Sequence, residues 1–341
     1  MKKILFACAI AATFAACTSA PKTAYVINGV AGEGVEDGAT VVLKGPLAND
    51  TLAVTEVVNG AFTFEGNADS TMTAYAMIDR QHVAQIYIEP GTITANLGER
   101  TATGTPLNDA YNEYSKAINA LYENEDLETS EYVALMKETY LKNADNLLGV
   151  DIWNDMLYDL SYDEMSELLE TAQPQIKNDR RNERMLNAKL AAKNTAAGAK
   201  FIDFEGITVD IKNAKNDGKP TTLGAVVAQG KPVIVDFWAS WCGPCRREIN
   251  EYLSQFAPEY AGKVNFVGVA VWENSVDDTK KAMGELPISW PVIFAGDRNQ
   301  GPTNDYGIMG IPHIMLIGAD GTIVARDLRG NKIKAAIDSI L

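Results

Sequence analysis

The stretch VDFWASWCGPC at residues 235–245 decides the fold and the chemistry expected of this chain. An apolar, β-branched run leads into it and the polar run RREIN follows it, so the sequence predicts a strand, a tight junction and a helix. Cys242 and Cys245 lie three positions apart at that junction, close enough to form a small disulfide ring. Cys242 falls at the helix N-terminus, where unpaired N–H groups and the helix dipole favour a thiolate. Cys245, one turn inside the helix, is suited to resolve a mixed disulfide.

A C-x-x-C pair is also half of a structural zinc site, which needs two further soft ligands. The chain has four cysteines and two histidines. Cys8 and Cys17 fall in an N-terminal leader, so only His82 and His313 remain as further candidate ligands. The composition therefore favours a redox dithiol that needs no metal and no cofactor, with a degenerate, inactive site as the other alternative.

Two segments resemble the signatures of thioredoxins. One is residues 235–245, and the other is the run GIPHIMLIGADG at residues 310–321, in which a proline opens a strand that ends in a hairpin turn. The resemblance covers about residues 198–341. This part of the chain also has an extended lead-in and a later insert, which make it similar to the TlpA/ResA branch of membrane-tethered thiol–disulfide oxidoreductases. The resemblance implies an α/β thioredoxin-like fold and a cis peptide bond before Pro312, with this loop against the dithiol.

The resemblance also implies an apolar patch beside the dithiol. Trp241, Pro244, Ile311 and Pro312 would form a surface on which an extended cysteine-containing peptide lies, paired in a strand-like manner with the backbone of Ile311. Trp238 is expected to belong to the core instead.

Asp236 is expected in the strand beneath the dithiol. A carboxylate with little solvent has a raised pKa and can accept the proton of Cys245, and the resemblance to thioredoxin supports this role. The lysine that accompanies this aspartate in thioredoxin has no counterpart in residues 266–272, so we expect no neighbouring cation and a still higher pKa. Glu248 matches a glutamate that lines the active-site cavity of ResA-like proteins, with an ordinary surface helix acid as the alternative. By strand alternation, His313 should point away from the patch.

The first 17 residues have the pattern of a secretory signal, with a basic start and an apolar run too short to span a bilayer. The run FAAC at residues 14–17 resembles a bacterial lipobox, although Phe14 replaces the usual leucine. Cys17 would then carry lipid chains that hold the protein on a membrane surface. The next two residues lack an inner-membrane retention aspartate, which favours the outer membrane, facing the periplasm. A soluble secreted protein is the alternative.

Two regions of different character precede the thioredoxin-like part. Residues 24–104 form short alternating runs with antiparallel turn chemistry, which predict a small all-β domain, a sandwich or barrel. This part resembles the N-terminal β-domain that often precedes thioredoxin-like domains in lipoproteins of Bacteroidetes-type bacteria. Residues 105–193 have helical periodicity and predict about four short helices, with a capping box at Ser161 and a last helix over 175–193. A linker is expected at residues 194–199.

The net charge of −15 argues against nucleic acid and against electrostatic binding to anionic lipid. Acidic residues far outnumber the two lysines between residues 123 and 170. They form either a docking face for a basic partner or a solvated surface that keeps the protein soluble. Residues 198–341 are nearly neutral, which suits a catalytic surface that binds varied partners through apolar contacts.

The sequence therefore predicts a periplasmic, membrane-anchored oxidoreductase that reduces protein disulfides. The Gly243-Pro244 pair resembles that of reducing thioredoxins. Expected partners are cysteine-containing envelope proteins, apocytochrome c among them, and a membrane dithiol that supplies electrons. One alternative is a disulfide isomerase or oxidase. Another, from a different class, is an envelope lipoprotein that binds a ligand through its β and helical parts and has a regulatory dithiol.

Overall fold

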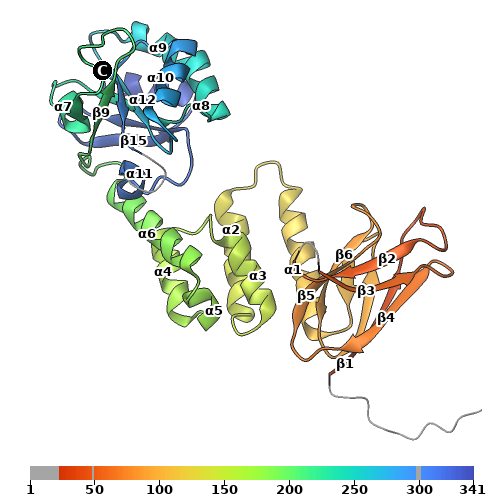
Figure 1. Cartoon of the computed structure of the whole chain (residues 1–341). Helices are drawn as coiled ribbons and strands as arrows, with labels where there is room; N and C mark the ends of the chain where they lie inside the picture. Colours follow the sequence, from red (N-terminus) through yellow and green to blue (C-terminus); the bar gives the residue numbers. More distant parts are fainter. Residues whose placement is uncertain (1–22, 48–49, 297–300) are drawn as a thin grey trace, which may run out of the picture. The chain divides into compact units, whose positions relative to one another are not determined.

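The computed structural model describes residues 23–47, 50–296 and 301–341, so Cys17 and the expected signal peptide lie outside the described residues. The chain divides into two compact units, an N-terminal unit (Met1–Asp159) and a C-terminal unit (Leu160–Leu341). The division falls inside the predicted helical region, whose helices are thus shared between the two units (Figure 1). Among the described residues, no helix combines the length and the apolar character needed to cross a bilayer.

A β-sandwich forms the first part of the N-terminal unit, in agreement with the alternating runs of the sequence. Its strands are β1 (Ala24–Val30), β2 (Thr40–Lys44), β3 (Thr51–Glu56), β4 (Ala61–Asn67), β5 (Met72–Met77), β6 (Val83–Ile88), β7 (Gly91–Asn96) and β8 (Thr101–Thr103). They form two sheets, with strand orders β4-β1-β7-β8 and β3-β2-β5-β6. Ile27, Ile86 and Ile93 are fully buried in the core of the sandwich. The turn chemistry did not reveal the parallel pairing of β1 with β7, because these strands are far apart in sequence.

Three helices complete this unit: α1 (Pro106–Tyr122), α2 (Thr129–Lys142) and α3 (Leu147–Met156). The rings of Tyr140 on α2 and Trp153 on α3 pack with their centroids 5.6 Å apart. The hydroxyl of Tyr87 on β6 donates a hydrogen bond of 2.7 Å to Asp151 on α3. Ring packing therefore joins α2 to α3, and a polar contact joins α3 to the sandwich.

The C-terminal unit begins with α4 (Tyr162–Thr171), α5 (Pro174–Lys177) and α6 (Arg180–Asn194). The predicted capping box is confirmed, because Ser161 and Glu164 exchange both of its hydrogen bonds. The prediction of one helix over 175–193 is wrong. The side chain of Asp179 accepts a hydrogen bond of 2.8 Å from the backbone N–H of Arg181 and starts a new helix at that point.

The segment expected to be a linker is held against the thioredoxin-like sheet. Thr195 is fully buried, and the guanidinium of Arg326 donates a hydrogen bond of 2.5 Å to its hydroxyl. The backbone N–H of Gly198 donates to the carbonyl of Ile323 at 2.8 Å. These long-range contacts make the segment an ordered connection, which its small, unpatterned residues did not indicate.

The rest of the C-terminal unit has the expected α/β thioredoxin-like fold (Figure 1). Its sheet has the strand order β10-β9-β13-β12-β11-β14-β15. The strands are β9 (Glu205–Val209), β10 (Pro220–Thr222), β11 (Val233–Trp238), β12 (Asn265–Ala270), β13 (Val292–Phe294), β14 (His313–Ile317) and β15 (Ile323–Leu328). The helices are α7 (Leu223–Val227), α8 (Gly243–Glu248), the π-helical turn η1 (Ile249–Leu253), α9 (Ser254–Glu259), α10 (Val276–Glu285), α11 (Pro302–Asp305) and α12 (Asn331–Asp338).

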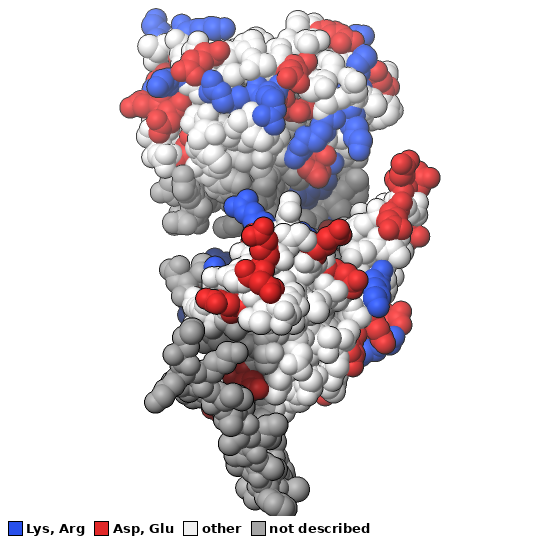
Figure 2. Space-filling model, turned by 90° about the vertical axis from the view of Figure 1, so that its right-hand side faces the viewer, with Lys and Arg blue, Asp and Glu red and all other residues white. Residues whose placement is uncertain are grey.

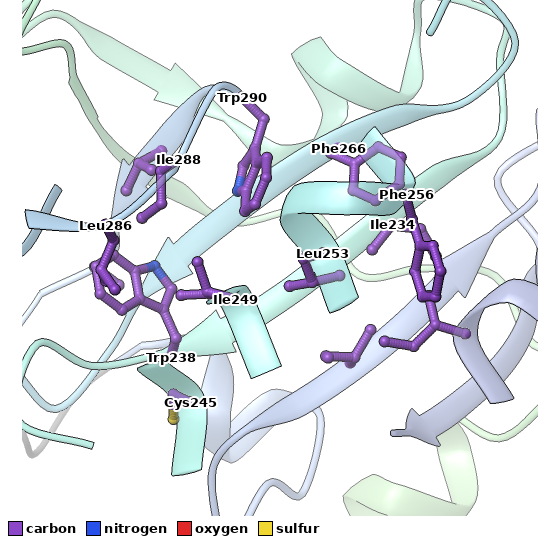
Figure 3. Close-up of a cluster of buried hydrophobic side chains, with 14 of the residues drawn as sticks. Ile234, Trp238, Cys245, Ile249, Leu253, Phe256, Phe266, Leu286, Ile288 and Trp290 are labelled. Atoms are coloured by element: carbon purple, nitrogen blue, oxygen red, sulfur yellow. The ribbon is translucent and has the colours of Figure 1, made fainter. Parts of the chain in front are cut away.

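Strand β11 is the centre of this fold and carries the dithiol at its end. Every residue of β11 is buried, and the strand pairs in parallel with β12 and antiparallel with β14. Trp238 lies in the core, as predicted, in one apolar cluster with Cys245 and Ile249 (Figure 3). The dithiol therefore stands on a rigid, fully packed base.

Candidate redox site

The dithiol lies at the predicted junction, where β11 ends and α8 begins. Cys242 is the N-cap residue of α8, and its Sγ accepts a hydrogen bond of 3.2 Å from the backbone N–H of Cys245. The two cysteines form a disulfide, with their Cα atoms 5.3 Å apart. Cys242 retains 4% exposure, whereas Cys245 is fully buried. An incoming group therefore reaches Cys242 first, and a helix N–H is already placed to stabilise a thiolate there.

The proline loop lies beside Cys242. The Ile311–Pro312 peptide bond is cis, as the resemblance implied, and the carbonyl oxygen of Ile311 is 3.7 Å from the Sγ of Cys242. Trp241 is 53% exposed, Pro244 is also exposed, and Ile311 is half-buried. Pro312 is buried, so the exposed part of the predicted apolar patch consists of Trp241, Pro244 and the half-buried Ile311. The use of these residues in substrate binding stays a prediction.

A buried glutamate that the sequence analysis missed anchors the loop before Cys242. Glu273 is 1% exposed and accepts two hydrogen bonds from Ser240, one from its backbone N–H at 2.6 Å and one from its hydroxyl at 2.8 Å. The indole N–H of Trp241 donates to the carbonyl of Trp272 at 3.0 Å. Arg246 donates to the carbonyl of Ser240 at 3.3 Å and to Glu285 at 2.8 Å. Nothing in the local pattern marks Glu273, since it acts on a residue 33 positions earlier.

We expect Glu273→Gln to lower the free energy of unfolding by about 1–3 kcal/mol, because the amide leaves one of the Ser240 donors without a carboxylate oxygen. Hydrogen exchange at Ser240 and Trp241 should become faster, and thermal unfolding measures the stability. The matched control is Glu251→Gln, an exposed acid of the same unit, which should change stability by less than about 0.5 kcal/mol. Equal effects of the two substitutions would show that the Ser240–Glu273 contact does not hold the loop.

Asp236 lies beneath the dithiol, in the middle of the sheet. Strand alternation places its side chain on the same face as Trp238, whose cluster contains both cysteines. Asp236 is 2% exposed, and its Oδ1 has no hydrogen-bond partner among the described residues. Burial, and secondly the carboxylate of Glu248, raise the pKa of Asp236 to about 8. This carboxyl group is therefore able to take up or release a proton near neutral pH.

A cation does act on Asp236, contrary to the expectation drawn from the missing lysine. Arg329, in the turn between β15 and α12, partly offsets the rise in the Asp236 pKa. Its guanidinium also donates hydrogen bonds to the carbonyl of Pro312 and, at 2.7 Å, to that of Leu328. The expectation of no cation is wrong because tertiary folding brings this arginine from a distant turn. The predicted direction of the pKa shift is confirmed.

Glu248 and His313, the two remaining candidates for the site, have different surroundings in the structure. Glu248 is 9% exposed, and its Oε1 accepts a hydrogen bond of 2.5 Å from the backbone N–H of Gly330, so it is not a surface acid. His313 is buried on the opposite face of the sheet, with Nε2 3.3 Å from the guanidinium of Arg326. Burial, and secondly Arg326, lower the pKa of His313 to about 4, so the imidazole is neutral at neutral pH.

Two family models match the chain. One, described as Redoxin, matches residues 196–341, and the other, described as a domain of unknown function (DUF4369), matches residues 25–111. The thiol:disulfide interchange protein CycY of Rhizobium leguminosarum bv. viciae is 33% identical over 132 residues, which cover 39% of this chain and 68% of that protein. The thiol-disulfide oxidoreductase ResA of Bacillus anthracis is 28% identical over 143 residues, which cover 41% of this chain and 70% of ResA.

Two of the similar solved structures come from the genus Bacteroides. The thioredoxin domain of a thiol-disulfide oxidoreductase from Bacteroides vulgatus is 28% identical, with a TM-score of 0.36, and the match covers 42% of this chain and 96% of that domain. A thiol:disulfide interchange protein from Bacteroides sp. is 27% identical, with a TM-score of 0.35, and the match covers 43% and 90% of the two chains.

The C-terminal unit thus joins a strand-to-helix dithiol, a buried aspartate and a cis-proline loop. The CycY relative is 33% identical over a segment that makes up 68% of its own length. This chain belongs to the thioredoxin-like TlpA/ResA family of thiol–disulfide oxidoreductases.

Proposed function

We propose that this oxidoreductase reduces protein disulfides in the bacterial envelope, with Cys242 as the attacking thiol and Cys245 as the resolving thiol. The observation that carries the proposal is the asymmetry of the pair. Cys242 lies beside an exposed apolar patch and accepts a helix N–H, whereas Cys245 is fully buried on the sheet face that carries Asp236. Only the first sulfur is open to a client protein.

The reaction starts from the reduced dithiol. The Cys242 thiolate attacks one sulfur of the client disulfide, so a Cys242–client bond forms and the second client sulfur leaves as a thiolate. Asp236 accepts the proton of the Cys245 thiol, and the Cys245 sulfur then attacks Cys242. The Cys242–Cys245 disulfide forms, the first client sulfur leaves as a thiolate, and two electrons have passed to the client. A second dithiol, which we assign to a membrane donor, must reduce the enzyme again.

The client-binding surface that we propose is formed by Trp241, Pro244 and Ile311, next to the buried Pro312. An extended peptide would pair with the backbone of Ile311, whose carbonyl lies beside the reacting sulfur. The C-terminal unit, uppermost in Figure 2, carries basic and acidic side chains next to one another on the face shown. A surface without one dominant sign of charge suits clients that share a disulfide and differ in charge.

We infer the reducing direction of electron flow from the contacts around the Cys242 sulfur. Arg246 is engaged by Ser240 and Glu285, and the Cys242 sulfur accepts its hydrogen bond from a backbone N–H. Strongly oxidising relatives depend on a strongly stabilised reduced form, and among the described residues no charged side chain donates a hydrogen bond to the Cys242 sulfur. Equilibration with glutathione should therefore give a potential nearer to about −270 mV, as in thioredoxin, than to about −120 mV, as in DsbA. A value near the oxidising end would favour the oxidase alternative.

We also propose that the protein is a lipoprotein, held on the periplasmic side of the outer membrane through Cys17. Its clients would be cysteine-containing envelope proteins, including apocytochrome c. Cys17→Ser should abolish the incorporation of labelled palmitate and move the protein from the membrane to the soluble fraction, since the acyl chains supply the anchor. Cys8→Ser is the matched control and should change neither result. Membrane retention of the unlabelled Cys17→Ser protein would refute the anchor.

A further inference from the structure

A cavity of about 680 Å³ opens in the N-terminal unit, where residues of β5, β6, α1, α2 and α3 meet. Its size lies within the usual range of small-molecule sites. Its wall is unusually rich in tyrosine, with rings contributed by Tyr75, Tyr111, Tyr114, Tyr122 and Tyr132. The Tyr122 and Tyr132 rings lie with their centroids 6.2 Å apart. The redox chemistry of the C-terminal unit makes no use of this cavity.

Three carboxylates line the same cavity. Asp151, Asp155 and Asp159 follow one another at four-residue intervals along α3 and just beyond its end. Asp151 already accepts hydrogen bonds from the hydroxyls of Tyr87, at 2.7 Å, and Thr73, at 3.2 Å. The side chain of Asp155 makes no hydrogen bond or ion pair with another described residue. No lysine or arginine occurs among the described residues that line the cavity.

This arrangement is electrostatically unfavourable for the protein alone. The side chain of Asp155 is exposed at the cavity wall, and its partial desolvation, and secondly the neighbouring Asp151, raise its pKa. Like charges four residues apart on a helix repel each other, and the C-terminal end of α3 adds the negative end of its dipole. Burial, and secondly the carboxylate of Asp155, likewise raise the pKa of Tyr114. The fold therefore places several carboxylates in an aromatic cavity, and the described residues of its wall include no lysine or arginine to balance their charge.

We propose that this cavity binds an organic cation, an ammonium or guanidinium group on an aliphatic chain. The faces of the tyrosine rings attract a cation, Asp155 supplies an open ionic partner, and the aliphatic chain would lie against Ile118 and Met136. A neutral sugar could also stack on the tyrosine rings and donate hydroxyl hydrogen bonds to the carboxylates, but it would leave their negative charge unbalanced. The same chemistry is offered by a free polyamine and by a lysine or arginine side chain of a peptide.

Calorimetric titration of the full chain at low salt tests the proposal with three probes: spermidine, the peptide Lys-Lys-Lys and neutral maltotriose. We expect saturable binding of a cationic probe and at least about tenfold weaker binding to Asp155→Asn, which keeps the shape and removes the charge. Asp126→Asn is the matched control, because it removes an exposed charge of the α1–α2 loop, outside the cavity, and should leave the affinity unchanged. Tyr122→Leu, at a half-exposed ring, should weaken cation binding several-fold.

The outcomes separate the possibilities. Asp155→Asn should melt no lower than the wild type, since it relieves repulsion, so weaker binding would not reflect unfolding. Binding of spermidine alone indicates a free amine as ligand, and binding of the peptide alone indicates a basic segment of a protein. Absence of saturable cation binding, equal losses in Asp155→Asn and Asp126→Asn, or binding of maltotriose alone would each overturn the proposal. Disulfide reduction by Asp155→Asn should be unchanged, so this test is independent of the redox function.

Discussion

Cys242→Ser will lower the rate of disulfide reduction by on the order of 1000-fold or more, because a serine hydroxyl is not ionised near neutral pH and cannot form the mixed disulfide. The measurement is the reduction of a protein disulfide under an excess of a small dithiol, which re-reduces the enzyme after each turnover. A residual rate within about tenfold of the wild-type rate would show that Cys242 is not the nucleophile.

Cys245→Ser tests the role of the second thiol. Its Cys242 thiol still attacks, but no second thiol resolves the product, so Cys242 should remain covalently joined to its client. Mass spectrometry of the protein isolated from cells would then identify both the clients and the membrane donor. The Cys242→Ser variant is the control and should carry no such adduct. Equal adducts on both variants would show that the exposed and the buried sulfur do not have the separate roles proposed.

Asp236→Asn is expected to slow the resolving step by about 10- to 100-fold, because an amide cannot accept the proton of Cys245. In the wild type, this step should become faster as pH rises through about 8, where Asp236 loses its proton. The variant should lack that inflection. Stopped-flow tryptophan fluorescence, from the exposed Trp241, follows the step. Glu248→Gln is a useful comparison, since loss of this carboxylate should lower the Asp236 pKa and move the inflection to lower pH.

The same group predicts how stability depends on pH. The pKa of Asp236 is about 8 in the folded protein, against about 4 in an unfolded chain, so the folded protein binds the extra proton between these values. Stability should therefore fall as pH rises from about 4 to about 8, by at most about 1.4 kcal/mol per pH unit from this group. Asp236→Asn should lack this component and be more stable than the wild type at pH 8. Denaturant unfolding of the oxidised protein at several pH values measures the difference. A pH dependence identical to that of the wild type would argue against a raised pKa.

The sequence alone determined the local features of this protein. The buried run before Cys242, the turn at the dithiol and the helix after it follow from short-range patterns, and so does the capping box at Ser161. The strands of the sandwich were predictable because alternation has a period of two residues and glycine, asparagine and aspartate mark the turns between them. Such features depend on residues within one or two turns of each other.

The tertiary structure decided everything that depends on distant residues. Arg329 comes close to Asp236, and Glu273 holds Ser240, only after the chain has folded. The same is true of the three carboxylates on and just beyond α3, which share a cavity with tyrosines from other elements. The break at Asp179 is a further example. The local sequence is compatible both with a continuing helix and with a new helix capped by Asp179, and the folded unit contains the second. Electrostatic interactions act between neighbours in space, and a linear pattern contains no direct record of which neighbours those are.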